Sequence, residues 1–576
     1  MAAEGDGRLT PDVRCVAIFP QGKTLTAQET QYAREAAALG ALTVLCPGDM
    51  SPEAAEACYG AQMAGAYRII PGADALQGVL RLCERERIPR EAVLHVCDGA
   101  AHRLPPAERP HRSAVTRVRG ALGRVKRAIR WRAMAASELM HVSPAEKRRL
   151  VAACKQADKG GRRFLVVSQM AAFDKGSCAY LKQLQALLPQ DSFFHLSETP
   201  AVPHSVLEEK LSGVYHCARW AAFPAVHPPR VTGRVPEARK KSASQAVRDA
   251  ALNLSLRLPE LGEEGALALS LYLEELFSLT MDAFRPQLVM MWNAFTAAHM
   301  ILTAVAKARN IPVMFMEFGV LPGTMGFDLR GQMGQSALAH EALLSMPQNA
   351  LDEAARVIDY LAHRRMNRNA QHADEPGSAV HLPRTGKRVV TFIGQNDYES
   401  GICPYDDTAR REHSPWYGSS LEALRALVPV CQALDCQLVY RPHPSMRVNA
   451  ADMPAGVVLS CGGDLFSLLE KSDLTVTLMS QVGYEALLHG RTVLMLGRCQ
   501  LTGKGCAWER DGEESLQDAV SKALDGGYTE NMKQAFRTHV AHVLRDYAYD
   551  DLSAREMRYG RQPHEWLSLL AEALAP

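Results

Sequence analysis

Short runs of apolar residues alternate along this chain with longer segments in which apolar residues recur at helical spacing. Near the N-terminus the apolar runs are 13–19, 41–46 and 92–97, and the segments with helical spacing are 27–39 and 73–87. Apolar runs of this length predict buried strands, and their alternation with helices is typical of a parallel sheet. We therefore predict a Rossmann-like lobe at the N-terminus.

The same alternation returns in the middle of the chain. Strands are predicted at 163–168 and 192–196. Residues 287–319 predict a strand, a helix and a second strand that ends in a glycine-rich loop. Two helices are expected after this loop, over residues 335–347 and 350–368.

A second group of apolar strands begins after residues 369–388, a polar stretch with Pro and Gly that we interpret as a linker. Its strands are predicted at 389–394, 436–442, 474–480 and 491–497. Each strand is followed by a helix or a turn, which predicts a second α/β lobe. Residues 525–576 have amphipathic helical spacing and are expected to pack back across the lobes.

These elements predict an α/β protein with two Rossmann-type lobes, a cleft between the lobes and C-terminal helices. The chain has 576 residues, more than one hydrophobic core usually serves, so several domains are expected. We assign residues 1–140 to an N-terminal lobe with a basic helix and residues 141–370 to an α/β region with an acidic loop. Residues 385–576 form the C-terminal lobe and the terminal helices in this assignment.

Composition narrows the class of protein. Hydrophobic residues make up 47% of the chain and charged residues 22%, which excludes a disordered protein. The 65 Lys and Arg residues nearly balance 63 Asp and Glu residues, for a formal net charge of +2. This balance does not indicate a nucleic-acid partner.

The cysteines and the N-terminus predict the compartment. The 14 cysteines are scattered and form no Cys-x-x-Cys pair, which indicates free thiols in a reducing compartment and no structural metal site. The first residues lack the features of a signal peptide, and no window reaches the ~18 apolar residues needed to span a bilayer. We therefore expect a cytoplasmic protein.

Residues 113–132 hold the local concentration of positive charge. Seven Arg and Lys residues are interleaved there with apolar ones. Such a helix could lie on an anionic membrane surface or contact a lipid-linked acceptor, which would make the protein peripheral at the inner face of the cytoplasmic membrane. A solvated helix that packs on its own domain explains the pattern equally well.

Four polar segments follow predicted strands, which is where ligands bind in open parallel sheets. They are GQNDYESGI (394–402), YRPHP (440–444), TLMSQVGYEALLHG (477–490) and MEFGVLPGTMGFDLRGQMGQS (316–336).

In the YRPHP segment, the two prolines hold the backbone extended on both sides of His443. Arg441 and a protonated His443 could then neutralise the phosphate of a nucleotide leaving group. A strand-end turn with a capping histidine is the alternative.

In the TLMSQVGYEALLHG segment, Ser480 is a natural N-cap for a helix that begins at Gln481, and the free N–H groups of the first turn would bind a phosphate. Gly483 would permit close approach of the ligand, and Glu485 could accept hydrogen bonds from ribose hydroxyls. An ordinary capped helix with a solvated glutamate is the alternative. In GQNDYESGI, Gln395 and Asp397 would order the cleft, although an Asx turn explains Asp397 equally well.

In their order along the chain, these motifs resemble the capsule polysaccharide synthesis family, and most closely its β-Kdo transferases, which handle CMP-Kdo and have a GT-B fold. The resemblance spans residues 287–505. It implies a GT-B-like α/β fold in which the C-terminal lobe binds the nucleotide sugar and the region before it faces the acceptor. It implies neither a metal ion nor another cofactor. The implied donor-binding residues are Gln395, Asp397, Arg441, His443, Ser480, Gln481, Gly483, Glu485 and Lys504.

The acidic loop departs from the family's pattern. In the related Kdo transferases and in similar bacterial sialyltransferases, this strand ends in two acidic residues and Gly, and the second acid is taken as catalytic. Here the triplet is Glu317-Phe318-Gly319, so the second acid is missing. We expect the catalytic carboxylate to be Glu317, anchored on a rigid strand, or Asp328, in the flexible glycine-rich loop, and we favour Glu317. Two acids that cap a loop are the alternative.

The resemblance implies a glycosyltransferase that moves an acidic ketosugar, Kdo, from CMP to a lipid-linked or growing surface polysaccharide, either capsule or lipopolysaccharide, and we expect the sugar's configuration to be retained. A UDP-sugar transferase or 2-epimerase with the GT-B fold is a second interpretation. The third is a non-catalytic scaffold in capsule assembly, prompted by Phe318 in place of an acid.

Overall fold

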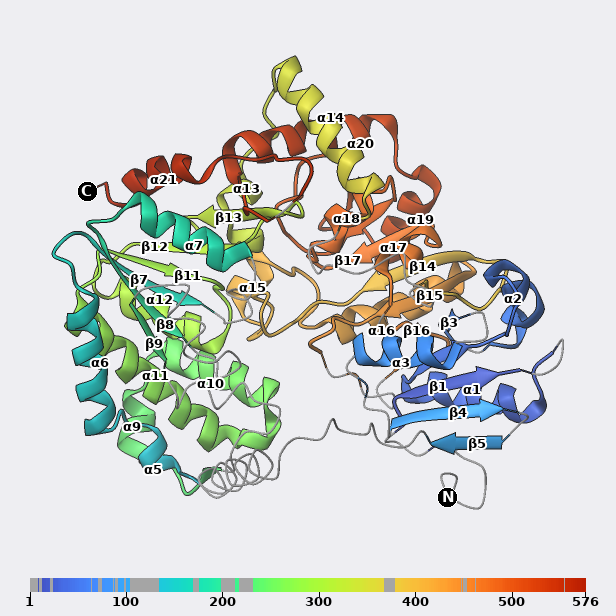
Figure 1. Cartoon of the computed structure of the whole chain (residues 1–576), viewed down its shortest axis with the longest axis horizontal. Coiled ribbons are helices and arrows are strands. Elements are labelled where there is room, and N and C mark those ends of the chain that lie inside the picture. The colour runs from blue at the N-terminus through green and yellow to red at the C-terminus, as the bar shows by residue number, and fades with distance from the viewer. Residues whose placement is uncertain are drawn as a thin grey trace. The chain divides into compact units, whose positions relative to one another are not determined.

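Over the residues that it describes, the computed structural model contains three larger β-sheets, a two-stranded sheet and the helices that connect their strands (Figure 1). The described residues are 9, 13–20, 24–63, 65–70, 75–85, 88, 92–97, 100–103, 134–168, 176–197, 213–216, 231–366, 379–446, 448, 453–461, 463–553 and 555–575.

The chain divides into two compact units. Unit 1 consists of Met1–His111, Ile358–Asn396 and Trp416–Arg537, and unit 2 consists of Arg112–Val357, Asp397–Pro415 and Thr538–Pro576. This grouping differs from the three regions assigned from the sequence, because the N-terminal lobe and most of the C-terminal lobe belong to one unit. A bridge between Tyr67 and His381 joins the N-terminal sheet to the segment that precedes the C-terminal lobe.

Unit 1 contains two sheets. The N-terminal sheet has the order β3-β2-β1-β4-β5, and the C-terminal sheet has the order β16-β15-β14-β17-β18-β19 with all its strands parallel. The strands of the first sheet are β1 (Cys15–Phe19), β2 (Leu42–Leu45), β3 (Tyr67–Ile69), β4 (Val93–Cys97) and β5 (Ala100–Arg103). Those of the second are β14 (Arg388–Ile393), β15 (Cys436–Arg441), β16 (Val458–Leu459), β17 (Leu474–Thr477), β18 (Val493–Met495) and β19 (Trp508–Glu509).

Helices connect these strands. They are α1 (Ala27–Leu39), α2 (Pro52–Tyr59), α3 (Ala75–Arg85), α16 (Ser420–Ala433), α17 (Leu465–Glu470), α18 (Val482–Leu488) and α19 (Leu516–Gly526). Helix α1 illustrates why they form where the sequence predicts. The side chains of Thr26 and Glu29 each accept a hydrogen bond from the other's backbone N–H, and Gly40 ends the helix with a φ of 66°.

Unit 2 is built on a seven-stranded sheet in the order β20-β13-β12-β11-β7-β8-β9. The strands from β12 to β9 are parallel, whereas β13 and β20 are paired antiparallel. The strands are β7 (Arg163–Ser168), β8 (Ser192–Ser197), β9 (Val214–His216), β11 (Leu288–Met291), β12 (Val313–Phe318), β13 (Thr324–Asp328) and β20 (Ala548–Asp550), with β6 (Met134–Ala135) and β10 (Val231–Thr232) in the two-stranded sheet.

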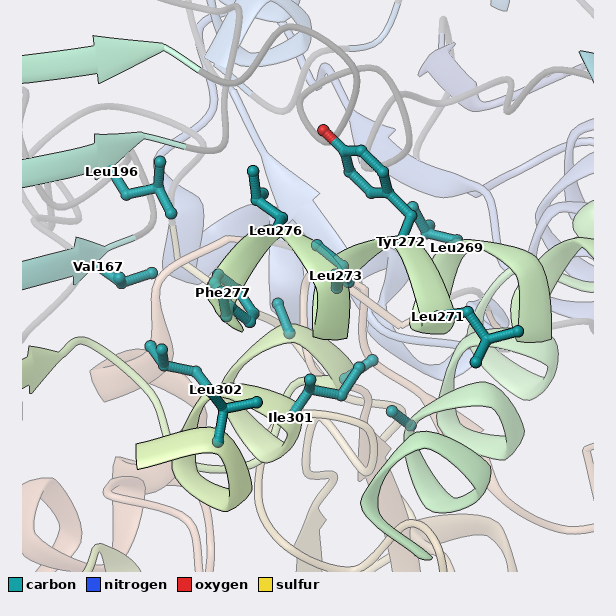
Figure 2. Close-up of a cluster of buried hydrophobic side chains, with 14 of the residues drawn as sticks. Val167, Leu196, Leu269, Leu271, Tyr272, Leu273, Leu276, Phe277, Ile301 and Leu302 are labelled. Atoms are coloured by element: carbon teal, nitrogen blue, oxygen red, sulfur yellow. The ribbon is translucent and has the colours of Figure 1, made fainter. Parts of the chain in front are cut away.

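The core of unit 2 forms around helix α11 (Gly262–Phe284). This helix is apolar around most of its circumference, as expected of a helix with neighbours on several sides. Figure 2 shows Leu276 and Phe277 on α11, with Val167 and Leu196 on the strands to one side and Ile301 and Leu302 on a neighbouring helix. Strands β7 and β8 contribute Val167 and Leu196, and helix α12 (Ala297–Lys307) contributes Ile301 and Leu302 to the same buried cluster.

The other helices of unit 2 are α5 (Ala136–Leu139), α6 (Pro144–Ala157), α7 (Gly176–Leu187), α9 (Glu237–Ser242), α10 (Gln245–Arg257), α13 (Ala337–His340), α15 (Asp407–Glu412) and α21 (Trp566–Ala573). Helices α14 (Gln348–His363) and α20 (Glu530–His542) contain the boundaries between the units.

The α/β, GT-B-like class predicted from the sequence is confirmed by these parallel sheets, their connecting helices and the helices near the C-terminus. Two predicted elements are wrong. The helix expected over 335–347 is reduced to α13, because Glu341 is already extended. The C-terminal segment 525–576 is not helical throughout, because β20 pairs with the edge strand β13.

Two sequence predictions concern residues outside the described ranges. The basic segment 113–132 lies outside the described residues, as does the first half of the linker predicted at 369–388. Among the helices that the structure describes, none is long and apolar enough to cross a membrane.

Three buried histidines make unit 2 sensitive to acid. Burial lowers the pKa of His195 and of His299 to about 3, and that of His413 to about 4. In the unfolded state, a histidine has a pKa of ~6.5. As the pH falls below that value, the histidines therefore bind protons in the unfolded state but not in the folded state, which favours unfolding. The stability contributed by the neutral imidazoles is therefore present above pH ~6.5 and is lost as the pH falls through the folded-state pKa values, about 4 for His413 and about 3 for His195 and His299.

We predict that His299→Gln reduces the pH dependence of the free energy of unfolding by up to ~1.4 kcal/mol per pH unit below pH ~6.5. The measurement is urea unfolding at pH values on both sides of that point. The control is His363→Gln, because His363 is exposed in the last turn of α14. Equal slopes for wild type and His299→Gln would contradict the explanation.

Candidate functional site

The donor-side residues predicted in unit 1 lie at one edge of the six-stranded sheet. Gln395 follows β14, Arg441 ends β15, and Ser480 follows β17. These three strands are neighbours in the order β15-β14-β17, and all run parallel. Their carboxyl ends therefore meet at the same edge, and the structure brings these predicted residues together there.

The side chain of Arg441 makes a hydrogen bond within the protein. Its side chain is buried, and Nη2 donates a 2.7 Å hydrogen bond to the carbonyl of Gly463. Gly463 has a φ of 76°, and a Cβ there would lie 1.9 Å from a guanidinium nitrogen of Arg68. The loop that receives Arg441 is thus a close contact between the two sheets of unit 1 in which only glycine fits.

His443 is half-buried and begins a turn after β15. Its Nδ1 accepts a 3.1 Å hydrogen bond from the backbone N–H of Ser445, and its carbonyl accepts one of 2.9 Å from Met446. Because Nδ1 is the acceptor, the neutral ring carries its proton on Nε2. The turn therefore fixes the tautomer in which Nε2 can donate to an anion.

The helix predicted to begin at Gln481 begins one residue later. Helix α18 has Gln481 as its N-cap, and no side chain of Gln481 caps it. The hydroxyl of Ser480 instead accepts a 3.3 Å hydrogen bond from the N–H of Val482, and the N–H of Ser480 donates to Oγ1 of Thr477 at 3.0 Å. Ser480 still meets the first turn of the helix, as the sequence predicts.

The next residues of this segment contact the loop after β18. The side-chain amide of Gln481 donates to Oε1 of Gln500 at 3.3 Å. A Cβ on Gly483 would lie 3.3 Å from Leu501, so the glycine permits close packing of the helix on this loop. Glu485 is buried one turn inside the helix.

Lys504 is buried, with 2% of its surface exposed. Burial raises the pKa of Glu509, and the positive charge of Lys504 opposes that rise. Glu509 also accepts a 2.8 Å hydrogen bond from the N–H of Gly503. Lys504 thus lies close to an acidic side chain of its own unit, and its role at a donor site stays a prediction.

Gln395 and Asp397 belong to different units. The backbone N–H of Gln395 donates to Oγ of Ser420 at 2.8 Å, and its side-chain Oε1 is buried without a hydrogen-bond partner in the described part of unit 1. A buried amide oxygen of this kind is unusual and suits a ligand donor. The carbonyl of Asp397 accepts a 3.1 Å hydrogen bond from Cys403.

The two candidate catalytic acids of unit 2 lie on neighbouring antiparallel strands. Glu317 on β12 is opposite Gly326 on β13, and Asp328 on β13 is opposite Phe315 on β12. The register places both acids on the same face of the sheet, as diagonal neighbours. The expectation that Asp328 lies in a flexible loop is wrong, because the glycine-rich segment contains β13 and Asp328 ends that strand.

Asp328 is an anchor for the chain that follows it. Its Oδ1 accepts hydrogen bonds from the N–H groups of Arg330 at 2.7 Å and Gly331 at 3.0 Å, and its Oδ2 accepts one from Ala337 at 2.7 Å. The hydroxyl of Tyr547 donates to the same Oδ2 at 3.2 Å. Burial raises the pKa of Asp328, and these four donors oppose that rise. The contacts indicate a structural carboxylate.

Phe318 stands where the related enzymes have an acid. Its ring packs edge-to-face against Trp292, with the ring centroids 4.9 Å apart. The side chain therefore has a packing role beside Glu317, which is half-buried at the preceding position of the strand.

The sequence did not predict that the C-terminal segment contributes to the acidic site, which is the region around Glu317 and Asp328. Strand β20 pairs with β13, and Arg555 forms ion pairs of 2.8 Å with Asp550 and 2.6 Å with Asp551. A Cβ on Gly323 would lie 2.4 Å from the Arg555 guanidinium, so this segment covers the turn before β13. A three-residue strand gives too short a pattern to be found from sequence.

In the described part of the chain, no group of His, Cys, Asp and Glu side chains is arranged to hold a metal ion. The donor-side residues of unit 1 and the acids of unit 2 offer carboxylates, an imidazole, hydroxyls and an arginine.

We predict that Asp328→Ala lowers the free energy of unfolding by ~2–4 kcal/mol, because it leaves backbone N–H groups of Arg330, Gly331 and Ala337 without an acceptor. Urea unfolding measures the change. The control is Asp352→Ala, on the exposed surface of α14, with an expected change within ~0.5 kcal/mol. A loss no greater than that of the control would show that Asp328 is no anchor.

Comparison with known proteins supports part of this picture. Residues 434–545 match the family described as "Capsule polysaccharide biosynthesis protein". A search of curated proteins found no match.

Solved structures give weaker likenesses. The β-Kdo 2,7 transferase of Thermosulfurimonas dismutans KpsC is 20% identical over 43% of this chain and 83% of its own, with a TM-score of 0.29. The β-Kdo 2,4 transferase of the same protein is 16% identical over 44% and 87%, with a TM-score of 0.30. The UDP-GlcNAc 2-epimerase of Neisseria meningitidis is 12% identical over 65% and 94%, with a TM-score of 0.27. Superpositions this limited do not distinguish one activity from another.

The family match covers the part of unit 1 in which the sequence motifs are densest. It includes Arg441, His443, Ser480, Glu485 and Lys504, and it extends beyond the motifs to residue 545. The resemblance inferred from the motifs is thereby confirmed for residues 434–545, the segment that matches the capsule polysaccharide biosynthesis family.

Proposed function

We propose that this protein is a glycosyltransferase that moves an acidic ketosugar, Kdo, from a CMP-activated donor to a lipid-linked or growing surface polysaccharide. The observation that carries the proposal is the alignment of Gln395, Arg441 and Ser480 at the ends of neighbouring parallel strands. Two of these three strand ends lie in the segment that matches the capsule family. Open parallel sheets bind nucleotides at this edge.

The chemistry of this edge suits a nucleoside monophosphate. Because Nδ1 of His443 is an acceptor, Nε2 can donate a hydrogen bond to a phosphate from the neutral ring, and the ring carries positive charge when protonated. The hydroxyl of Ser480 is a second donor, and Glu485 is an acceptor for ribose hydroxyls in this proposal. Charge-assisted hydrogen bonds to the phosphate would stabilise CMP as it leaves.

In the proposal, Glu317 is the catalytic carboxylate. Asp328 already accepts four hydrogen bonds, whereas Glu317 ends an apolar strand and is only half-buried. In a retaining reaction, the Glu317 carboxylate would bond C2 of the sugar while the C2–O bond to phosphate breaks and CMP leaves with the electron pair. The acceptor hydroxyl would then displace Glu317, and its proton would pass to the phosphate oxygen.

The cellular location and the partners of the protein are part of the same proposal. A lipid-linked acceptor would place the protein at the inner face of the cytoplasmic membrane. Donor and acceptor would be its only small-molecule partners, without a metal ion.

We predict that His443→Ala weakens CMP binding by ~10–100-fold, which is the loss of one charge-assisted hydrogen bond. Isothermal titration calorimetry with CMP, CDP and UDP measures the affinity and tests the choice of nucleotide. His363→Ala, on the exposed surface of unit 1, is the matched control and should bind as wild type does. Unchanged CMP affinity in a folded His443→Ala protein would remove His443 from the site, and preference for UDP would favour the epimerase or UDP-sugar class.

We predict that Glu317→Gln lowers turnover of CMP-Kdo by ~10³-fold or more while the affinity for CMP is retained. The amide keeps the size of the side chain and loses the carboxylate. CMP release with and without acceptor glycan is the measurement, and Asp328→Asn is made beside it. Near-wild-type turnover of both variants would contradict the assignment and place the catalytic acid elsewhere in the chain, whereas no turnover in the wild type would favour the non-catalytic scaffold.

A further inference from the structure

The acidic pair of unit 2 has a third member that comes from the far end of the chain. Tyr547 ends the π-helical turn Val543–Tyr547 and immediately precedes β20. Ala548, the first residue of β20, is opposite Gly326 on β13, and Gly326 is opposite Glu317 on β12. Three strands thus fix Tyr547 beside both acids. π-Helical turns of this kind are frequent at functional sites.

Tyr547 contacts Asp328 through its hydroxyl. The 3.2 Å hydrogen bond goes to Oδ2, the same oxygen that accepts from the N–H of Ala337. The phenol is therefore the one side chain among the four donors that hold Asp328, and the other three are backbone groups.

The ring of Tyr547 lies near the Glu317 side of the pair, across Gly326. A Cβ built on Gly326 would lie 3.5 Å from Cε1 of Tyr547 and 3.9 Å from Cγ of Glu317. The absence of a side chain at Gly326 thus leaves a space that the tyrosine ring and the glutamate share. Partial burial and the charges of Asp328, Glu317 and Glu341 raise the pKa of Tyr547, so the phenol keeps its proton at neutral pH.

We propose that Tyr547 is a positioning residue for the acidic site, which holds Asp328 by its hydroxyl and limits the conformations of Glu317 by its ring. The inference rests on the proposed function, in which Glu317 is the catalytic carboxylate. A carboxylate must be held close to the reacting carbon, and a small displacement of it costs much of the rate. The fold therefore uses its C-terminal segment to complete a site whose acids lie more than two hundred residues earlier.

The test uses three variants of the full-length protein. Tyr547→Phe keeps the ring and removes the hydroxyl, and Tyr547→Ala removes both. Tyr549→Phe is the matched control, because it removes a hydroxyl two residues further along, where the ring packs edge-to-face against Phe327 at 5.4 Å. Thermal unfolding confirms that each variant is folded, and calorimetry gives its affinity for CMP.

Hydrolysis or transfer of CMP-Kdo is then followed by CMP release over a range of pH. We expect Tyr547→Phe to lower kcat by ~10²-fold with KM and CMP affinity unchanged, Tyr547→Ala to lower it further, and Tyr549→Phe to match wild type. The hydroxyl of Tyr547 lowers the pKa of Asp328. Without this hydroxyl, Asp328 should be protonated and lose its anchoring role at a higher pH, so the acid limb of the kcat profile should move to higher pH.

Two results would overturn the inference in different ways. Wild-type kcat and pH profile in Tyr547→Phe would overturn this inference alone, because the proposed function would still stand. A wild-type protein that neither hydrolyses nor transfers CMP-Kdo would overturn both.

Discussion

The acidic site depends on one buried carboxylate. Asp328 ends an antiparallel strand, collects three backbone N–H groups from the next nine residues and accepts the hydroxyl of Tyr547. Without that acceptor, these partly buried donors would lose their hydrogen-bond partner, at a cost of ~2–4 kcal/mol of folding stability. Because Asp328 holds both the loop after β13 and the C-terminal segment, the geometry around Glu317 follows from it.

Unit 1 depends on a different constraint, the parallel alignment of its C-terminal sheet. Parallel strands deliver residues that are far apart in sequence to one edge, and Gln395, Arg441 and Ser480 meet there for that reason. The side chains that lie beyond the strand ends, such as His443, are then oriented by local turns. The proposal accordingly assigns recognition of the nucleotide to unit 1 and the acid chemistry to unit 2.

The sequence predicts most of unit 1 and less of unit 2. Helix α1 of unit 1 and strand β7 of unit 2 both occur at the predicted residues, because capping residues and continuous apolar runs are local signals. Strand β20 was missed because its three residues are strand only through pairing with β13. The same cause explains Asp328 and Tyr547, since a carboxylate that anchors a distant segment has the same local sequence as one in a flexible loop. Glycine contacts such as Gly326 also depend on neighbours that no window of sequence contains.

The proposed function requires that the carboxyl edge of the six-stranded sheet binds the nucleotide of a CMP-activated sugar. A crystal structure of the protein with CMP tests this most directly. We expect electron density for the phosphate within hydrogen-bonding distance of Nε2 of His443 and Oγ of Ser480, with the ribose toward Glu485. Density for CMP at another place on the protein, or none at a saturating concentration, would contradict it.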